Sequence, residues 1–242
     1  QKTRFGTHFQ NLLACRDMAS LANKTVVVLG ASGQVGSGAV YGLVNLGATV
    51  IAPLRSEKAE ATLKADIEWD TIANKANLKI VPHCDVGTTA GLSKLKEFLG
   101  ATKVDHVIST IGGWYEPGPA FHDLSVDNFS HAITNQAQPH YTGYLALFPH
   151  LAPHASYTFI LGMLGEIIPF KSSWAMISIG ASTVYGIARS AMADAREVPD
   201  LDLRVNALNI GHMVRRHAEV ESGQAGGALS NRLIGEGIAR FV

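Results

Sequence analysis

Residues 25–38 read TVVVLGASGQVGSG and join a run of apolar, largely β-branched residues to a glycine-rich turn. The run Thr25–Leu29 predicts a strand buried on both faces, and residues 35–46 carry apolar side chains at helical spacing. A strand, a glycine turn and a helix in this order can bind a pyrophosphate, because glycine allows close approach and the helix directs free N–H groups and its positive dipole end at the anion. The alternative is a tight strand-to-helix turn that binds nothing.

Composition limits the classes of protein to consider. The 242 residues fit one α/β domain, and 20 basic against 20 acidic residues give no net field that favours nucleic acid or an anionic membrane. Cys15 and Cys84 cannot build a disulfide framework, which favours a reducing compartment. No apolar run is long enough to span a bilayer. We expect a cytoplasmic protein, with an organelle lumen as the alternative because the chain begins at Gln1 and its N-terminus therefore looks processed or truncated.

Strand and helix patterns alternate through the first half of the chain. Strands are expected at Thr25–Leu29, 48–54, 78–82 and 104–110, with helices at 35–46, 57–74 and 89–99. This alternation is typical of a parallel sheet with right-handed crossovers. The sequence therefore predicts an α/β fold: a single Rossmann-type, doubly wound domain over residues 21–242, with about six parallel strands and helices on both faces. Residues 1–20 are expected to form an N-terminal extension.

The end of the second predicted strand indicates which dinucleotide would bind. In a dinucleotide site an acidic residue at this point hydrogen-bonds the adenosine ribose of NAD. Here the sequence reads APLRS, so that Leu54 takes this position and Arg55 follows. A carboxylate would repel a ribose phosphate, whereas an arginine can hold one with two hydrogen bonds. We therefore expect NADP(H) as the cofactor. The alternative is that Arg55 is a solvated loop charge.

Several further segments carry a family resemblance. The turn GASGQVG, the segment VPHCDV around Asp85 and the strand VDHVISTIGG are followed by LSVDNFSHAITNQ, which contains Asn135, and by LRVNALNIG, which ends at Gly211. Together these segments resemble the short-chain dehydrogenase/reductase family over residues 21–242, although the glycine spacing is that of its extended and atypical branches. The resemblance implies a cofactor site built from Gly30, Ser32, Gly33, Gln34, Val35, Gly36, Arg55, Asp85, Thr110, Gly112, Gly211 and Met213.

The catalytic positions depart from the family pattern. The family transfers a hydride with a Ser, a Tyr and a Lys, assisted by an asparagine for which Asn135 is the match. Alignment on Gly165 places the serine position at Gly162, and alignment on GIARS places the Tyr and Lys at Ile177 and Ala181. The chain therefore resembles an atypical member that lacks the Ser-Tyr-Lys residues.

A carboxylate elsewhere in the expected crevice offers replacement acid–base chemistry. Glu166 is the best candidate because it lies four residues after the serine position, and the alternative is a solvated loop carboxylate. His150 and His154 are flanked by prolines and have no third ligand near them, so we expect no metal.

Two functions remain open. The first is an NADP(H)-dependent oxidoreductase that acts on a small organic substrate by hydride transfer without a Tyr–Lys proton relay. The second is a non-catalytic dinucleotide-binding subunit with a structural or regulatory role in a larger assembly. A homo-oligomer or a partner subunit is expected for the second, because the family's last strand is not found in this sequence.

Overall fold

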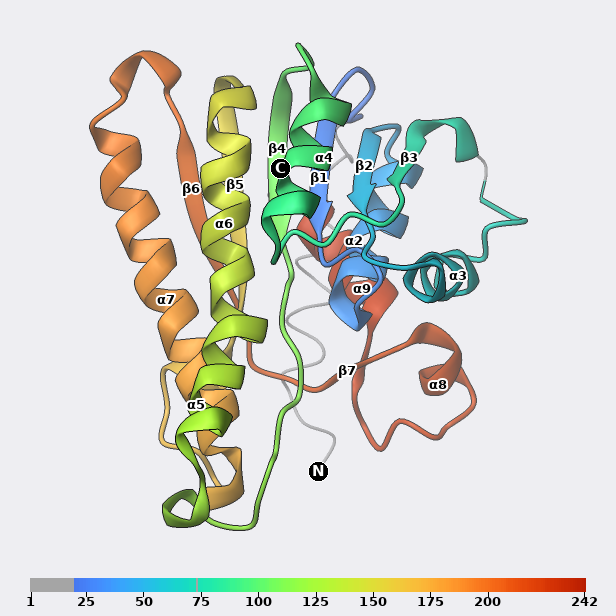
Figure 1. Ribbon diagram of the computed structural model, residues 1–242. Coiled ribbons are helices and arrows are strands. Elements are labelled where there is room, and N and C mark those ends of the chain that lie inside the picture. The colour runs from blue at the N-terminus through green and yellow to red at the C-terminus, as the bar shows by residue number, and fades with distance from the viewer. Residues whose placement is uncertain (1–19, 73) are drawn as a thin grey trace.

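Six parallel strands form the central sheet in the computed structural model, which describes residues 20–72 and 74–242 (Figure 1). The strand order is β3-β2-β1-β4-β5-β6. The strands are β1 (Thr25–Leu29), β2 (Thr49–Pro53), β3 (Leu78–Val81), β4 (Val104–Ser109), β5 (Leu151–Gly162) and β6 (Arg204–Ile210). The order reverses between β1 and β4, so a crevice is expected at the carboxyl ends of these two strands. The predicted doubly wound α/β fold is confirmed, while the extension expected at residues 1–20 lies almost wholly outside the described residues.

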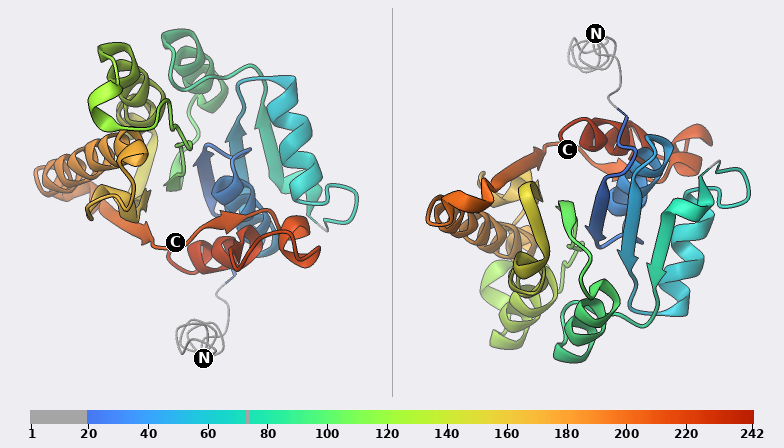
Figure 2. Two further views of the ribbon diagram at one scale, coloured as in Figure 1. Left: turned by 90° about the horizontal axis from the view of Figure 1, so that it is seen from below. Right: turned by 90° about the horizontal axis from the view of Figure 1, so that it is seen from above.

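Helices cover both faces of the sheet. The longer ones are α2 (Gln34–Asn45), α3 (Glu57–Asp66), α4 (Thr89–Leu99), α5 (Val126–Ala132), α6 (Gln138–Leu147), α7 (Ala175–Arg196) and α9 (Asn231–Ala239). Successive side chains of β1 alternate between two cores: Val26 and Val28 pack with α2, α3 and α9, while Val27 and Leu29 pack with α4, α6 and α7. Figure 2 looks along the strands and shows these layers on opposite sides of the sheet.

The C-terminal segment lies against α2. After β6 the chain forms β7 (Val214–Arg215), the short helix α8 (His217–Glu221) and β8 (Leu229–Ser230) before α9. Helices α2 and α9 cross at glycines, because a Cβ at Gly38 would meet the carbonyl oxygen of Asn231 and a Cβ at Gly235 would meet that of Gly38. The Asn231 amide also donates to the Ser37 hydroxyl at 3.0 Å. This close backbone contact fixes the helix that follows the glycine turn.

The helix expected over 57–74 is shorter than predicted, since α3 ends at Asp66. Glu68 takes a left-handed conformation with φ of +50°. Its carboxylate accepts from Arg232 of α9 at 2.7 Å. The chain turns here so that Ile67 and Ile72 remain buried against the sheet. Burial and a contact with a distant helix therefore override the helical pattern of the sequence.

Candidate functional site

A cleft of about 380 Å³ opens at the carboxyl ends of β1, β2 and β4. It lies at the reversal of the strand order, where open α/β sheets bind their ligands. Eight of the site residues predicted from the sequence line it. They are Gly30, Ser32, Gly33, Arg55, Asp85, Thr110, Gly112 and Asn135. The cleft therefore gathers residues from five separate segments of the chain.

The three glycines of the turn have different roles. Gly30 has φ of +79°, and a Cβ there would lie 2.9 Å from the Thr110 hydroxyl oxygen. A Cβ at Gly36 would meet the Gly30 carbonyl oxygen, so both glycines allow the turn to fold tightly onto β4. Gly33 has only that carbonyl oxygen near its Cβ position, at 3.1 Å, and it is the N-cap of α2. Gly33 is thus the glycine whose missing side chain leaves the cleft open.

The start of α2 can accept an anion. The N–H groups of Gln34, Val35 and Gly36 lie in the first turn and therefore have no intrahelical partner, and no side chain of the N-cap residue bonds to them. A pyrophosphate beside Gly33 would meet these donors and the positive end of the helix dipole. The residues present therefore fit a dinucleotide.

We expect Gly33→Val to abolish dinucleotide binding while the protein stays folded, because the added carbons enter the pyrophosphate space. Gly30→Val should instead destabilise the fold, since its φ is unfavourable for a β-branched residue. Titration of NADPH by fluorescence, with circular dichroism of each variant, tests both statements. Gly186→Val is the matched control, because the Cβ position at Gly186 in α7 has no neighbour within 4 Å. Undiminished binding by folded Gly33→Val would show that the turn does not carry the phosphate.

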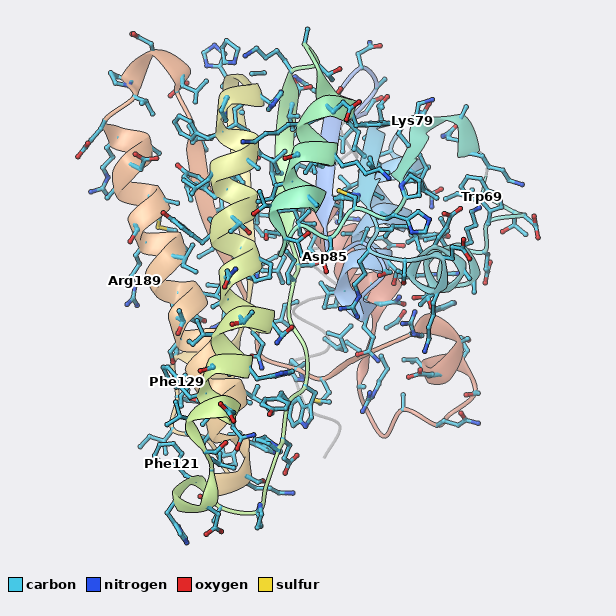
Figure 3. The ribbon with its side chains drawn as sticks, viewed as in Figure 1. Trp69, Lys79, Asp85, Phe121, Phe129 and Arg189 are labelled. Carbon is cyan, nitrogen blue, oxygen red and sulfur yellow. The ribbon has the colours of Figure 1, made fainter. Side chains whose placement is uncertain are left out.

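The end of the cleft next to β2 contains one cation and one carboxylate. Arg55 follows β2, is exposed, and forms no ion pair with any carboxylate among the described residues. Asp85 follows β3, and Figure 3 places it at the carboxyl end of the sheet. Its Oδ1 accepts from the Gly87 N–H at 2.9 Å, which orients the carboxylate. These two groups can meet the polar edges of an adenosine.

The segment after β4 is tied to the glycine turn. The Thr110 hydroxyl donates to the Leu29 carbonyl at 2.9 Å, and the Thr110 N–H donates to the same oxygen at 2.9 Å. Thr110 therefore supports the turn at Gly30. Gly112 is exposed in the cleft, and its Cβ position has no neighbour within 4 Å.

Asn135 lies in a π-helical segment, Ile133–Ala137, between α5 and α6. The family resemblance suggests one long helix here, and the structure instead divides it. Pro139 has no N–H to donate to the Asn135 carbonyl, which favours a local widening of the helix. The Asn135 amide donates to the His131 carbonyl at 3.0 Å, and the residue lines the cleft.

The three positions aligned with the catalytic Ser, Tyr and Lys carry no titratable group. Gly162 ends β5 and has open space around its Cβ position. Ile177 is buried on α7, and Ala181 lies one turn further along the same helix.

Glu166 does not line the cleft. Its carboxylate accepts from the Asn209 amide of β6 at 2.9 Å. Burial, together with the negative charge of this carboxylate, raises the pKa of Tyr185 to about 12. Glu166 therefore lies on the side of the β5 loop that faces β6 and α7. Gly211 and Met213 also lie outside the cleft, directly after β6.

A contact between two loops was not foreseen from the sequence. Glu116, after β4, accepts from the Ser173 hydroxyl just before α7, and its other oxygen accepts from the Trp114 indole at 3.2 Å. Trp114 also packs edge-on against Trp174, with ring centroids 5.1 Å apart. These contacts join the loops after β4 and β5, which lie beyond the carboxyl end of the sheet (Figure 1). Glu116 and Ser173 are 57 residues apart, and the only signal in the sequence was the concentration of aromatic residues in both loops.

Two negative findings concern the described residues alone. No cluster of three or more His, Cys, Asp or Glu side chains is arranged to hold a metal ion within residues 20–72 and 74–242. In the same part of the chain, no helix has the length and apolar character needed to cross a bilayer.

Two of three comparisons with known proteins found similar proteins. No family model matches the chain. A curated protein, the short-chain dehydrogenase/reductase iacG of Pestalotiopsis fici, is 23% identical over 197 residues, which cover 79% of this chain and 74% of that protein.

Solved structures show the same architecture. A dehydrogenase/reductase from Sinorhizobium meliloti 1021 superposes with a TM-score of 0.72 at 18% identity, covering 96% of this chain and 94% of its own. A carbonyl reductase from Pseudomonas aeruginosa PAO1 gives 0.71 at 16% identity, covering 89% and 88%. The chain is thus similar to a curated short-chain dehydrogenase/reductase, and it shares its fold with solved dehydrogenase and reductase structures.

Proposed function

We propose that residues 21–242 form one NADP(H)-binding domain, which transfers a hydride to or from a small organic substrate without a Tyr–Lys proton relay. The observation that carries the proposal is the cleft itself, which combines an uncapped helix start at Gly33 with Arg55 and Asp85 at the β2 end. The full set of proposed cofactor contacts is Gly30, Ser32, Gly33, Gln34, Val35, Gly36, Arg55, Asp85, Thr110, Gly112, Gly211 and Met213.

Arg55 supports NADP(H) over NAD(H). Leu54, which directly follows β2, is buried and apolar. This position therefore carries no carboxylate that could bind a ribose hydroxyl of NAD. Arg55 lines the cleft with its guanidinium uncommitted to any carboxylate in the described part of the chain. A ribose 2′-phosphate would neutralise the positive charge of Arg55 and accept two hydrogen bonds from its guanidinium.

The chemistry is limited by the residues at the positions aligned with the family's catalytic Tyr and Lys. Isoleucine at 177 and alanine at 181 cannot donate a proton or lower the pKa of a donor. A substrate that already carries a cationic or strongly polarised carbon can accept a hydride without proton donation. Asn135 is retained in the cleft and is available to orient such a substrate or the nicotinamide ribose. Glu166 acts as acid or base only if the β5 loop turns toward the cleft.

The same observations favour a second candidate, a dinucleotide-binding subunit without catalysis. The proton relay is absent, because its three positions are occupied by Gly162, Ile177 and Ala181. The glycine turn proposed to bind phosphate is present, and a protein that only binds the dinucleotide would also retain such a turn. Hydride transfer from bound NADPH to a cationic imine separates the two candidates, since only the first predicts consumption of the cofactor.

We expect NADPH to bind about tenfold or more tightly than NADH, since a charge-assisted bidentate contact contributes about 1.5–3 kcal/mol. Arg55→Ala should reduce this preference, mostly by weakening NADPH. Fluorescence titration of both cofactors measures the ratio, and Lys58→Ala, in the first turn of α3, is a control for loss of a nearby positive charge. Equal affinity for the two cofactors in the natural protein, or a ratio unchanged by Arg55→Ala, would contradict the assignment.

A further inference from the structure

His140 of α6 forms two hydrogen bonds directly beneath the cleft. Its side chain is buried, with Nδ1 lying 2.7 Å from the Ser109 hydroxyl oxygen and Nε2 lying 2.6 Å from the Ile111 carbonyl oxygen. A carbonyl oxygen can only accept, so Nε2 carries the hydrogen and Nδ1 accepts from Ser109. Burial lowers the pKa of His140 to about 4, so the ring is neutral at physiological pH, and the Ile111 carbonyl selects the tautomer with the hydrogen on Nε2.

The bond to Ile111 determines the direction of the next peptide group. In a trans peptide the C=O of one residue and the N–H of the next point in opposite directions, and no cis peptide is present among the described residues. His140 holds the Ile111 carbonyl toward the core, so the Gly112 N–H points the other way, toward the cleft that Ile111 and Gly112 line. Within the described residues this N–H has no hydrogen-bond partner.

The surroundings keep this arrangement rigid. Thr110, one residue earlier, is bonded to the Leu29 carbonyl by both its N–H and its hydroxyl. Two consecutive residues after β4 are therefore held by different parts of the fold, Thr110 by the β1 end and Ile111 by α6. Gly112, the next residue, has no atom within 4 Å of its Cβ position.

We propose that His140 is a positioning residue of the dinucleotide site, which orients the Ile111–Gly112 peptide so that the Gly112 N–H donates to an oxygen of the bound cofactor. The inference rests on the proposed function, because it requires a dinucleotide in the cleft. His140 itself does not touch the cofactor: it acts through the peptide that it holds.

His106 provides a matched control. It is also a buried histidine bonded to a serine hydroxyl, that of Ser156 at 2.9 Å, and burial lowers its pKa to about 4 as well. It lies on β4 three residues before Ser109 and does not line the cleft. A purely structural role for buried histidines therefore predicts the same behaviour for both positions.

The experiment compares His140→Leu with His106→Leu by thermal unfolding and by NADPH titration. We expect both variants to lose thermal stability and only His140→Leu to lose affinity, by about five- to tenfold for one misdirected hydrogen bond. His140→Gln retains an amide donor for the Ile111 carbonyl and should recover part of the affinity. Wild-type NADPH affinity in folded His140→Leu, or an equal loss in His106→Leu, would overturn the inference.

A second measurement needs no variant. In the natural protein labelled with ¹⁵N, saturating NADPH should shift the Gly112 amide signal and slow its hydrogen exchange. If NADPH binds and the Gly112 amide does neither, His140 does not position a donor and the inference fails alone. If neither NADPH nor NADH binds the natural protein, the proposed function fails and the inference with it.

Discussion

Acidification from pH 7 to pH 4.5 is expected to lower the free energy of unfolding by about 5 kcal/mol. Two buried histidines cause this loss. Burial lowers the pKa values of His106 and His140 to about 4 each, from an ordinary value of 6.5. Between these two values the unfolded chain binds protons that the folded protein does not, so stability falls as the pH falls through this window. Each histidine contributes about 2–3 kcal/mol to the difference at pH 4.5.

Urea unfolding followed by tryptophan fluorescence at several pH values between 8 and 4.5 measures the effect. His106→Leu and His140→Leu each remove one of the two titrating groups. Although both are expected to be less stable than the natural protein, each should show about half of its pH dependence. A free energy of unfolding that stays constant from pH 7 to pH 5 would show that these histidines are protonated in the folded state.

The fold could be predicted from short local patterns. Thr25–Leu29 is a strand as predicted. The expected strand at 48–54 is one residue longer than β2 at each end, and those at 78–82 and 104–110 are one residue longer than β3 and β4 at the C-terminal end. β1 and β2 are buried along almost their whole length, and short, largely apolar runs of this kind are identified well from sequence. The expected helix over 57–74 was too long because the chain turns at Glu68, whose partner Arg232 lies 164 residues away (232 − 68) and leaves no signal in the local pattern.

The cleft could be predicted only in part. The glycine turn, Arg55, Asp85 and Thr110 all lie within four residues after the end of a strand, and the carboxyl ends of parallel strands meet at one edge of the sheet. Glu116 and His140 were missed because each is bonded to a partner in another segment, the Ser173 hydroxyl and the Ile111 carbonyl respectively, and a single polar residue leaves no periodic signal. Glu166 was placed by its distance along the chain, which does not reveal that its carboxylate faces Asn209.

The natural protein is expected to reduce simple aldehydes and ketones with NADPH at least about 10²-fold more slowly than a reductase with a complete proton relay. A positioned general acid contributes about 10²–10⁴ in rate. Neither Gly162, Ile177 nor Ala181 can supply that acid or support one. Steady-state assays over a panel of small carbonyl compounds, with cofactor binding measured in parallel, test this expectation.

Restoring the relay should raise that rate if the bound cofactor is held in a reactive pose. The test is the triple variant Gly162→Ser, Ile177→Tyr and Ala181→Lys, made together because residues that act as a unit are not additive. Open space around the Gly162 Cβ position accepts a serine, while Ile177 is 8% exposed, so the larger tyrosine ring must be accommodated on the buried face of α7. Gly162→Ser alone is the control, since a serine without the tyrosine donates no proton to the product.

Brisk turnover by the natural protein would contradict the assignment of these three positions and would require another donor, with Glu116 and Glu166 the carboxylates to substitute first. A silent natural protein and an active triple variant would instead show that the cleft still presents its cofactor for hydride transfer, and that the proton relay is the part that is missing.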